Sequence, residues 1–163
     1  MERRDIFNQI AQKYSTMEYC KKMAGLNPSM NFDDYFKFAF VRNPYDRFAS
    51  GVLRYSMVID KVPKEKFSEY VVDSPNVFEK WRTSKPMHPY LTIDGKLDSM
   101  DFIGRYENIQ EDWSKVCKIM GVPDDLPHMN KSGYTYENIY TDEARELVYE
   151  YYKKDFEMFN YDK

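Results

Sequence analysis

A short apolar run that ends on an arginine is the part of this sequence best suited to chemistry. The stretch FKFAFVRNPYDRFASG (residues 36–51) holds an apolar run, 36–41, followed by Arg42 and an Asn-Pro pair. Asn43 is a good N-cap, and Pro44 suits the first helical position, where its missing N–H is no loss. A helix that begins there offers free N–H groups and a positive dipole end, which favour an anion.

Phosphate is the anion that these residue types suit. An arginine guanidinium offers a planar fork of donors, and ligands of open α/β sheets bind beyond the carboxyl ends of strands, where Arg42 is expected. Ser50 comes about two turns into the helix, on the same polar face as Arg47 and Arg54, so its hydroxyl can reach the same anion. Spacing alone leaves an alternative open, in which Arg42 caps the sheet by pairing with Asp46 or with a carbonyl.

The composition describes a folded protein and excludes several kinds of site. The 163 residues predict one domain, and an aromatic content of 17% is unlike a disordered chain. A net charge of −3 argues against a general nucleic-acid binder. Two cysteines outside any CxxC pattern and two histidines predict no metal site. Since no apolar run approaches the ~20 residues that span a bilayer, we expect no membrane segment in this chain.

Hydrophobic periodicity predicts many helices and few strands. The run 36–41 reads as a strand buried on both faces, as in a parallel sheet. The stretch MDFIGRYE reads as a second short strand that ends near Gly104. Helices are expected over 3–14, 17–24, 44–58, 64–73, 76–82, 108–121 and from 141 onward. The fold class is therefore helix-rich α/β. Because a sheet has about 5–6 strands on average, two strands indicate that part of the sheet is missing.

Capping patterns mark the last two long helices. Asn108 with Glu111 at the third position comes close to a capping box, and Thr141 is a good N-cap before acidic residues. The inward faces of these helices are expected to include Met120 and Leu147, respectively.

Four blocks of the sequence resemble one enzyme family. The stretch 36–51 resembles the 3′-phosphate-binding segment of the Golgi-type carbohydrate sulfotransferases and their bacterial relatives, sulfotransferase family 2. Three further blocks resemble the family in the same order: MDFIGRYENIQEDWSKVCKIMGVP, LPHMNKS and YTDEARELVYEYYKKDFEMFNY. Together they cover about residues 35–163. The resemblance implies a P-loop-like sulfotransferase fold, in which residues 1–163 form a single, N-terminally incomplete domain.

The resemblance also implies a donor and the residues that bind it. The family transfers a sulfuryl group from 3′-phosphoadenosine 5′-phosphosulfate (PAPS) to a hydroxyl, here expected to belong to a carbohydrate, and releases adenosine 3′,5′-bisphosphate (PAP) without a metal. Arg42 and Ser50 stand where the family binds the 3′-phosphate. Asn130, Lys131 and Ser132 resemble the loop that closes over the nucleotide.

Three residues are candidates for the part of the site that binds the acceptor hydroxyl, and each has an alternative role. His88 aligns with a family histidine and is the candidate general base or acceptor contact, the alternative being a surface-loop histidine. Arg105 and Glu107 resemble a recurring pair in the family, and we expect a structural ion pair, with substrate contact as the alternative.

One family feature does not occur in this sequence. The loop K-T-G-x-T-S normally holds the 5′-phosphosulfate, and we expect it, with the first strand, to lie upstream of Met1. The alternative is an inactive remnant that binds PAP, PAPS or a partner protein. A kinase of related fold would need a Walker sequence, which is not seen. We expect a cytoplasmic protein, or a Golgi-lumen protein if an anchor lies upstream.

Overall fold

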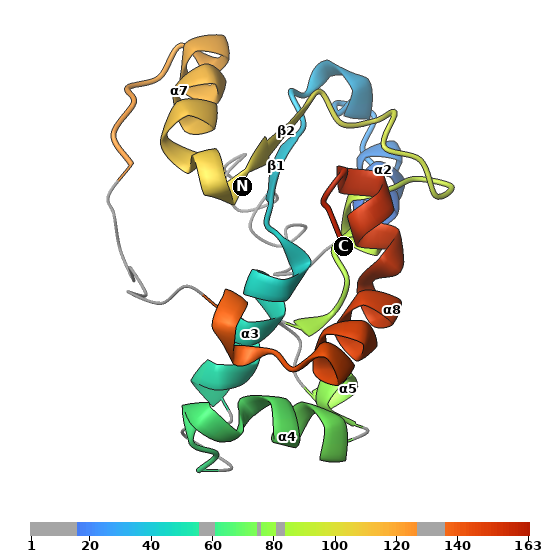
Figure 1. Cartoon of the computed structure of the whole chain (residues 1–163). Helices are drawn as coiled ribbons and strands as arrows, with labels where there is room; N and C mark the ends of the chain where they lie inside the picture. The colour runs from blue at the N-terminus through green and yellow to red at the C-terminus, as the bar shows by residue number, and fades with distance from the viewer. Residues whose placement is uncertain (1–15, 56–60, 75, 81–83, 127–135) are drawn as a thin grey trace. The chain divides into compact units, whose positions relative to one another are not determined.

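The chain folds into two compact units, each assembled from separate stretches of sequence. The computed structural model describes residues 16–55, 61–74, 76–80, 84–126 and 136–163 (Figure 1). The first unit holds the described residues up to 40 together with 87–104, and the second holds 41–86 with 105–163. The helix predicted over 3–14 lies outside the described residues.

A small parallel sheet is the centre of the first unit. Strand β1 (Phe38–Val41) pairs with β2 (Phe102–Arg105), and Figure 1 shows the two side by side. A Cβ on Gly104 would lie 2.5 Å from the ring of Phe40, so this close approach requires glycine. Over the described residues the sheet has these two strands, and the predicted helix-rich α/β class is confirmed.

Polar contacts fix the beginning of the sheet. The Asp101 carboxylate accepts the backbone N–H of Lys37 at 2.7 Å and pairs with its ammonium group at 3.2 Å. These contacts hold the pKa of Asp101 below its ordinary value, the backbone hydrogen bond contributing most.

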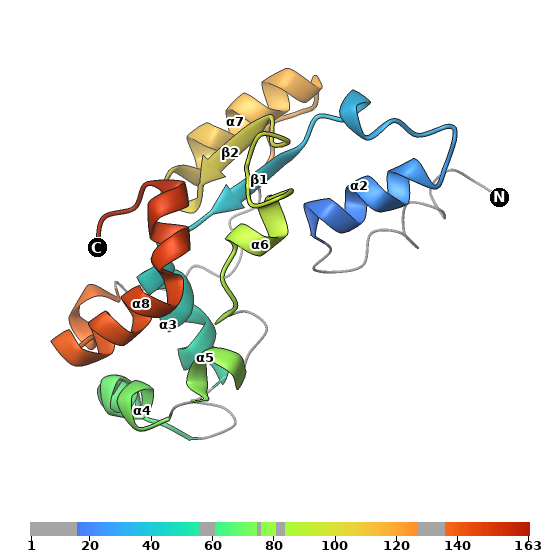
Figure 2. The same ribbon diagram turned by 90° about the vertical axis from the view of Figure 1, so that its right-hand side faces the viewer.

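Two helices of the first unit contact each other beside the sheet. Helix α2 (Met17–Gly25) confirms the prediction for 17–24, and it contacts the short α6 (His88–Leu91), as Figure 2 shows. A tight turn lies at Asp94-Gly95, with positive φ at both residues and a bridge between their neighbours.

The second unit is built from helices, most of which share one aromatic core. Its helices are α3 (Pro44–Tyr55), α4 (Phe67–Asp73), α5 (Val77–Lys80), α7 (Ile109–Met120) and α8 (Asp142–Phe159), with 3₁₀ turns η3 (Lys64–Lys66), η5 (Tyr106–Asn108) and η6 (Glu137–Ile139). Both α3 and α4 pack on α8. None of the described helices is long and apolar enough to cross a membrane.

Phe48 lies at the centre of this core and fixes α3. Its side chain has no exposed surface, stacks on Phe78 at 4.9 Å between ring centroids, and meets Phe67 and Tyr152 edge-on at 6.1 and 5.9 Å. Such ring pairs add about 0.5–1.5 kcal/mol each beyond the area they bury. The prediction that one face of α3 is buried and the other is polar is confirmed.

Two predicted core residues are exposed instead. Leu147 is 41% exposed because α8 buries a stripe with four-residue spacing, Ala144, Val148 and Tyr152, and Leu147 lies beside that stripe. Met120 is 48% exposed because it is the last residue of α7, one turn beyond the buried Val116.

The capping box predicted at Asn108 is not formed. Asn108 is the N-cap of α7, but its side chain makes no capping bond, because the preceding η5 turn holds its backbone at φ −116° and ψ 30°, outside the extended region. Glu111 pairs with Lys115 at 2.9 Å instead. By contrast, Thr141 caps α8 as predicted, accepting the N–H of Ala144 at 3.3 Å.

We predict that the fully buried phenol of Tyr152 makes the protein sensitive to alkali. Its hydroxyl donates to the carbonyl of Ser84, and burial raises the pKa of Tyr152 far above its ordinary value near 10, an effect that the charge of Arg47 opposes. Because the folded pKa is raised, this contribution to stability is complete below pH 10 and is lost as the pH rises further.

Urea unfolding at pH 7, 10 and 11 measures this effect. The Tyr152→Phe variant should lose about 1 kcal/mol of stability at pH 7, yet fall by about 1 kcal/mol less than the wild type between pH 10 and 11. Tyr149→Phe, which alters a half-buried tyrosine of the same helix, is the control. Parallel curves for Tyr152→Phe and the wild type would contradict the prediction.

Candidate phosphate-binding site

The start of α3 has the local geometry that its sequence predicts. The side chain of Asn43 accepts the N–H of Tyr45 at 2.9 Å, and the Asn43 carbonyl accepts the N–H of Arg47 at 2.9 Å. Pro44 takes the first helical position. The N-cap prediction is confirmed, and Arg42 stands directly before this capped end, after the last residue of β1.

Aromatic rings, and not a carboxylate, hold the guanidinium of Arg42. It lies 4.6 Å from the ring centroid of Tyr106 and 5.8 Å from that of Tyr136. Over the part of the chain that the structure describes, Arg42 makes no ion pair with Asp46 and no hydrogen bond to a carbonyl, so the sheet-capping alternative is wrong there. Stacking fixes a planar cation without using its N–H donors, which stay available to an oxyanion.

Ser50 lies in the same helix as predicted, on its polar face. It is half-buried and stands six residues beyond Pro44, which is about 9 Å along the helix axis. Arg47 is committed elsewhere, because its guanidinium donates to the carbonyl of Lys85 at 2.5 Å. The structure therefore places Arg42 directly before α3 and Ser50 within α3, in one unit.

The corner is the turn from β1 into α3, formed by Arg42, Asn43 and Pro44. A carboxylate holds its backbone in place. Glu107 accepts the backbone N–H of Asn43 on one oxygen, at 2.7 Å, and the hydroxyl of Tyr161 on the other, at 2.9 Å. Sequence patterns do not predict this role, because Asn43 and Glu107 are 64 residues apart and no spacing rule connects them.

Arg105 anchors the end of α8 instead of pairing with Glu107. Its guanidinium donates to the carbonyls of Phe159 and Asn160 at 2.9 Å each and lies 4.5 Å from the ring centroid of Tyr161. The predicted ion pair between Arg105 and Glu107 is wrong within the described residues. Instead, both side chains contact Tyr161.

The neighbouring charges shift the pKa of Tyr161 in opposite directions. Burial raises this pKa most, and the hydrogen bond to Glu107 and its negative charge raise it further. The positive charges of Arg105 and Arg42 oppose the rise. Arg42, Glu107, Arg105 and Tyr161 therefore form one electrostatic group at the start of α3.

Of the other predicted site residues, one is described by the structure and three lie outside the described ranges. His88 is the first residue of α6, in the first unit; it is half-buried, and its carbonyl accepts the Thr92 hydroxyl at 2.9 Å. Its role as a base stays a prediction. Asn130, Lys131 and Ser132 lie outside the described residues. Where the structure describes the chain, no group of three or more His, Cys, Asp or Glu residues is placed to hold a metal ion.

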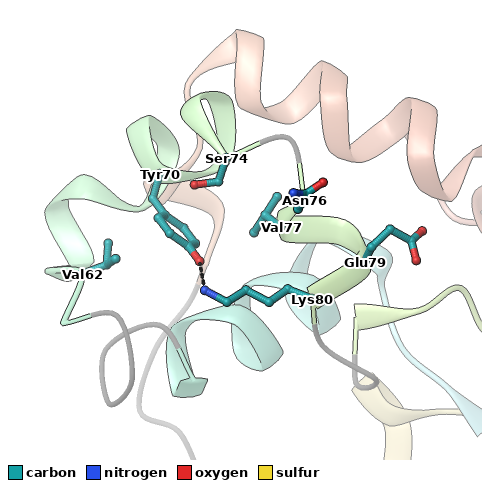
Figure 3. A pocket seen from close by; sticks show the side chains of 7 residues that line it. All are labelled: Val62, Tyr70, Ser74, Asn76, Val77, Glu79 and Lys80. Carbon is teal, nitrogen blue, oxygen red and sulfur yellow. Dashed lines mark hydrogen bonds between the residues drawn. The ribbon is translucent and has the colours of Figure 1, made fainter.

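A separate pocket lies in the second unit, between α4 and α5. It has a volume of about 840 Å³, and Lys80 reaches across it to within 3.4 Å of the Tyr70 hydroxyl (Figure 3). Its lining residues are Val62, Tyr70, Ser74, Asn76, Val77, Glu79 and Lys80. Neither Arg42 nor Ser50 lines this pocket, so it is distinct from the corner.

Comparison with known proteins decides the family. A model of the Sulfotransferase family, Sulfotransfer_2, matches residues 2–162, almost the whole chain. The chain belongs to the sulfotransferase family. The resemblance seen over 35–163 is thereby confirmed, and this sulfotransferase chain has Arg42 and Ser50 within the matched region.

The relatives of this sulfotransferase chain include carbohydrate sulfotransferases. It is 28% identical to carbohydrate sulfotransferase 11 of Rattus norvegicus and of Danio rerio, over 78% of this chain and 47% of each relative. An uncharacterized protein of Archaeoglobus fulgidus is 37% identical over 100 residues, which cover 58% of this chain and 75% of that protein. The chain thus spans about half the length of the carbohydrate sulfotransferases it matches. No solved structure matches it significantly.

We predict that the two asparagine N-caps differ in their contribution to stability. Asn43→Ala should lower the free energy of unfolding by about 1 kcal/mol, since it removes the acceptor for the Tyr45 N–H. Asn108→Ala is the matched control and should change it by less than about 0.5 kcal/mol, because that side chain makes no capping bond. Urea denaturation of the two variants checks this, and equal losses would count against the capped corner.

Proposed function

We propose that this chain carries the 3′-phosphate contacts of a PAPS-dependent sulfotransferase that acts on a carbohydrate hydroxyl. The observation that supports the proposal is the state of Arg42. It stands at the capped start of α3, is held by two tyrosine rings, and has no protein acceptor among the described residues.

The corner matches the chemistry of a phosphate monoester. Its dianion gains from the guanidinium fork of Arg42, from the positive end of the α3 dipole and from a hydroxyl donor such as Ser50. A hydrogen bond to a charged group contributes about 1.5–3 kcal/mol. Two such donors are therefore enough to discriminate strongly for a nucleotide that carries a 3′-phosphate.

The proposed reaction divides the work between this corner and other groups. An acceptor oxygen attacks sulfur, an S–O bond forms, the S–O bond to the 5′-phosphate breaks, and PAP leaves with the electron pair. A base takes the hydroxyl proton, and His88 is the candidate for that role. The K-T-G-x-T-S loop does not occur in this sequence, so the proposal assigns the 3′-phosphate contacts, and not the leaving-group contacts, to the residues given.

Support for a carbohydrate acceptor comes from the relatives. The carbohydrate sulfotransferases named above align with 78% of this chain, a stretch that is longer than the phosphate corner alone. The alternative is a remnant that binds PAP but transfers nothing. Binding of PAP without sulfate transfer from PAPS to carbohydrate acceptors would favour that alternative.

We predict that PAP binding depends on Arg42 and on Ser50. Calorimetry with PAP should show affinity about tenfold lower or more for Arg42→Ala and for Ser50→Ala, a loss of about 1.4 kcal/mol each. Arg54→Ala is the matched control, since Arg54 is exposed on the same helix about 15 Å from its start along the axis. Its affinity should stay within about twofold of the wild type.

Two outcomes would contradict this assignment. Equal losses for Arg42→Ala and Arg54→Ala would indicate diffuse attraction of an anion to basic side chains, without a defined corner. Absence of PAP binding by the folded wild-type chain would contradict the proposed 3′-phosphate site itself.

A further inference from the structure

We infer that Glu107 and Tyr161 are positioning residues for the nucleotide corner. The Tyr161 hydroxyl orients the Glu107 carboxylate, which fixes the backbone between Arg42 and Asn43 and so directs the Arg42 side chain. This inference rests on the proposed function, and it adds a role for the C-terminal end of the chain in nucleotide affinity.

The first step is the contact with the backbone. The N–H of Asn43 belongs to the peptide unit that joins Arg42 to Asn43, and this unit is planar. Glu107 accepts that N–H at 2.7 Å, so the carboxylate sets the plane of the peptide from which Arg42 projects. A hydrogen bond to an ionised acceptor is shorter and stronger than a neutral one, which suits a fixed point.

The η5 turn holds Arg42 by its side chain as well as by its backbone. Tyr106 and Glu107 are neighbours in this three-residue turn, which directly follows β2. The Tyr106 ring lies against the Arg42 guanidinium at 4.6 Å, while Glu107 binds the backbone next to it. The η5 turn therefore contacts both the backbone from which Arg42 projects and the guanidinium at the end of its side chain.

The second oxygen of Glu107 is fixed by Tyr161, which is itself well anchored. The hydroxyl of Tyr161 donates to it at 2.9 Å. Asn160 ends α8 in the left-handed conformation, with φ 55°, and the N–H of Tyr161 bonds the Phe156 carbonyl at 3.0 Å. Arg105 covers the Tyr161 ring. The end of α8 thus reaches Arg42 through Tyr161 and Glu107.

Charge decides which variant tests the inference. Removing Glu107 would loosen the corner but would also remove a negative charge near a bound phosphate, and these effects oppose each other. Tyr161→Phe removes the hydroxyl alone and keeps the ring under Arg105. A decrease in affinity for this variant therefore reports on position, without a change in charge.

The test is a double-mutant cycle on the full chain, measured by calorimetry with PAP and with adenosine 5′-phosphate. Tyr161→Phe should weaken PAP binding about fivefold. It should leave the affinity for adenosine 5′-phosphate, which lacks the 3′-phosphate, within about twofold. In the Arg42→Ala background the same change should have no further effect on PAP binding, because the hydroxyl acts through Arg42. Tyr19→Phe, at a partly exposed position of α2, is the control and should match the wild type.

The outcomes separate this inference from the proposed function. If PAP binding depends on Arg42 but Tyr161→Phe binds normally, or if the two losses add, the positioning role is wrong and the proposed function stands. If the wild type does not bind PAP, both fail. If Tyr161→Phe proves unstable, Glu107→Asp, which keeps the negative charge but shortens the side chain, replaces it in the cycle. In either variant the Asn43 amide should exchange its hydrogen at least about tenfold faster, and unchanged protection would overturn the inference.

Discussion

The burial of one face of α3 is the constraint on which the second unit depends. Phe48 is enclosed by the rings of Phe67, Phe78 and Tyr152, which come from α4, α5 and α8. A helix held this firmly along its length cannot adjust at its start, so the position of its N-terminus is set by packing. The polar face and the capped N-terminus of α3 then remain available to an anion. Packing on one face and binding groups on the other is what a preorganised phosphate site requires.

Both strands of the sheet lead into the corner that holds Arg42. Arg42 follows β1, and the η5 turn follows β2, so the residues after the two strands contact each other at the start of α3. Tyr106 fixes the guanidinium by stacking, and Glu107 fixes the backbone by a hydrogen bond. Neither contact uses the N–H donors of Arg42. A site arranged in this way pays little reorganisation when an oxyanion binds, because its cation is already oriented.

Local rules predicted the elements and the corner but not the contacts that close it. The Asn43 cap, the start of α3 and the Thr141 cap follow from residue types a few positions apart, and each is present. Asn108 failed as a capping box because a 3₁₀ turn precedes it, and hydrophobic periodicity does not report such a turn. The hydrogen bond from Asn43 to Glu107 joins residues 64 positions apart. Tertiary packing sets that distance, and no single-sequence pattern carries it.

The most direct test of the central claim is an amide NMR map of the labelled chain titrated with PAP. If the corner binds the 3′-phosphate, the amide signals of Arg42, Asn43, residues 45–47 and Ser50 should move most, and they should move far less with adenosine 5′-phosphate. If the largest changes instead fall on the residues of the pocket between α4 and α5, such as Tyr70 and Lys80, the nucleotide binds elsewhere. The account given for Arg42 would then be wrong.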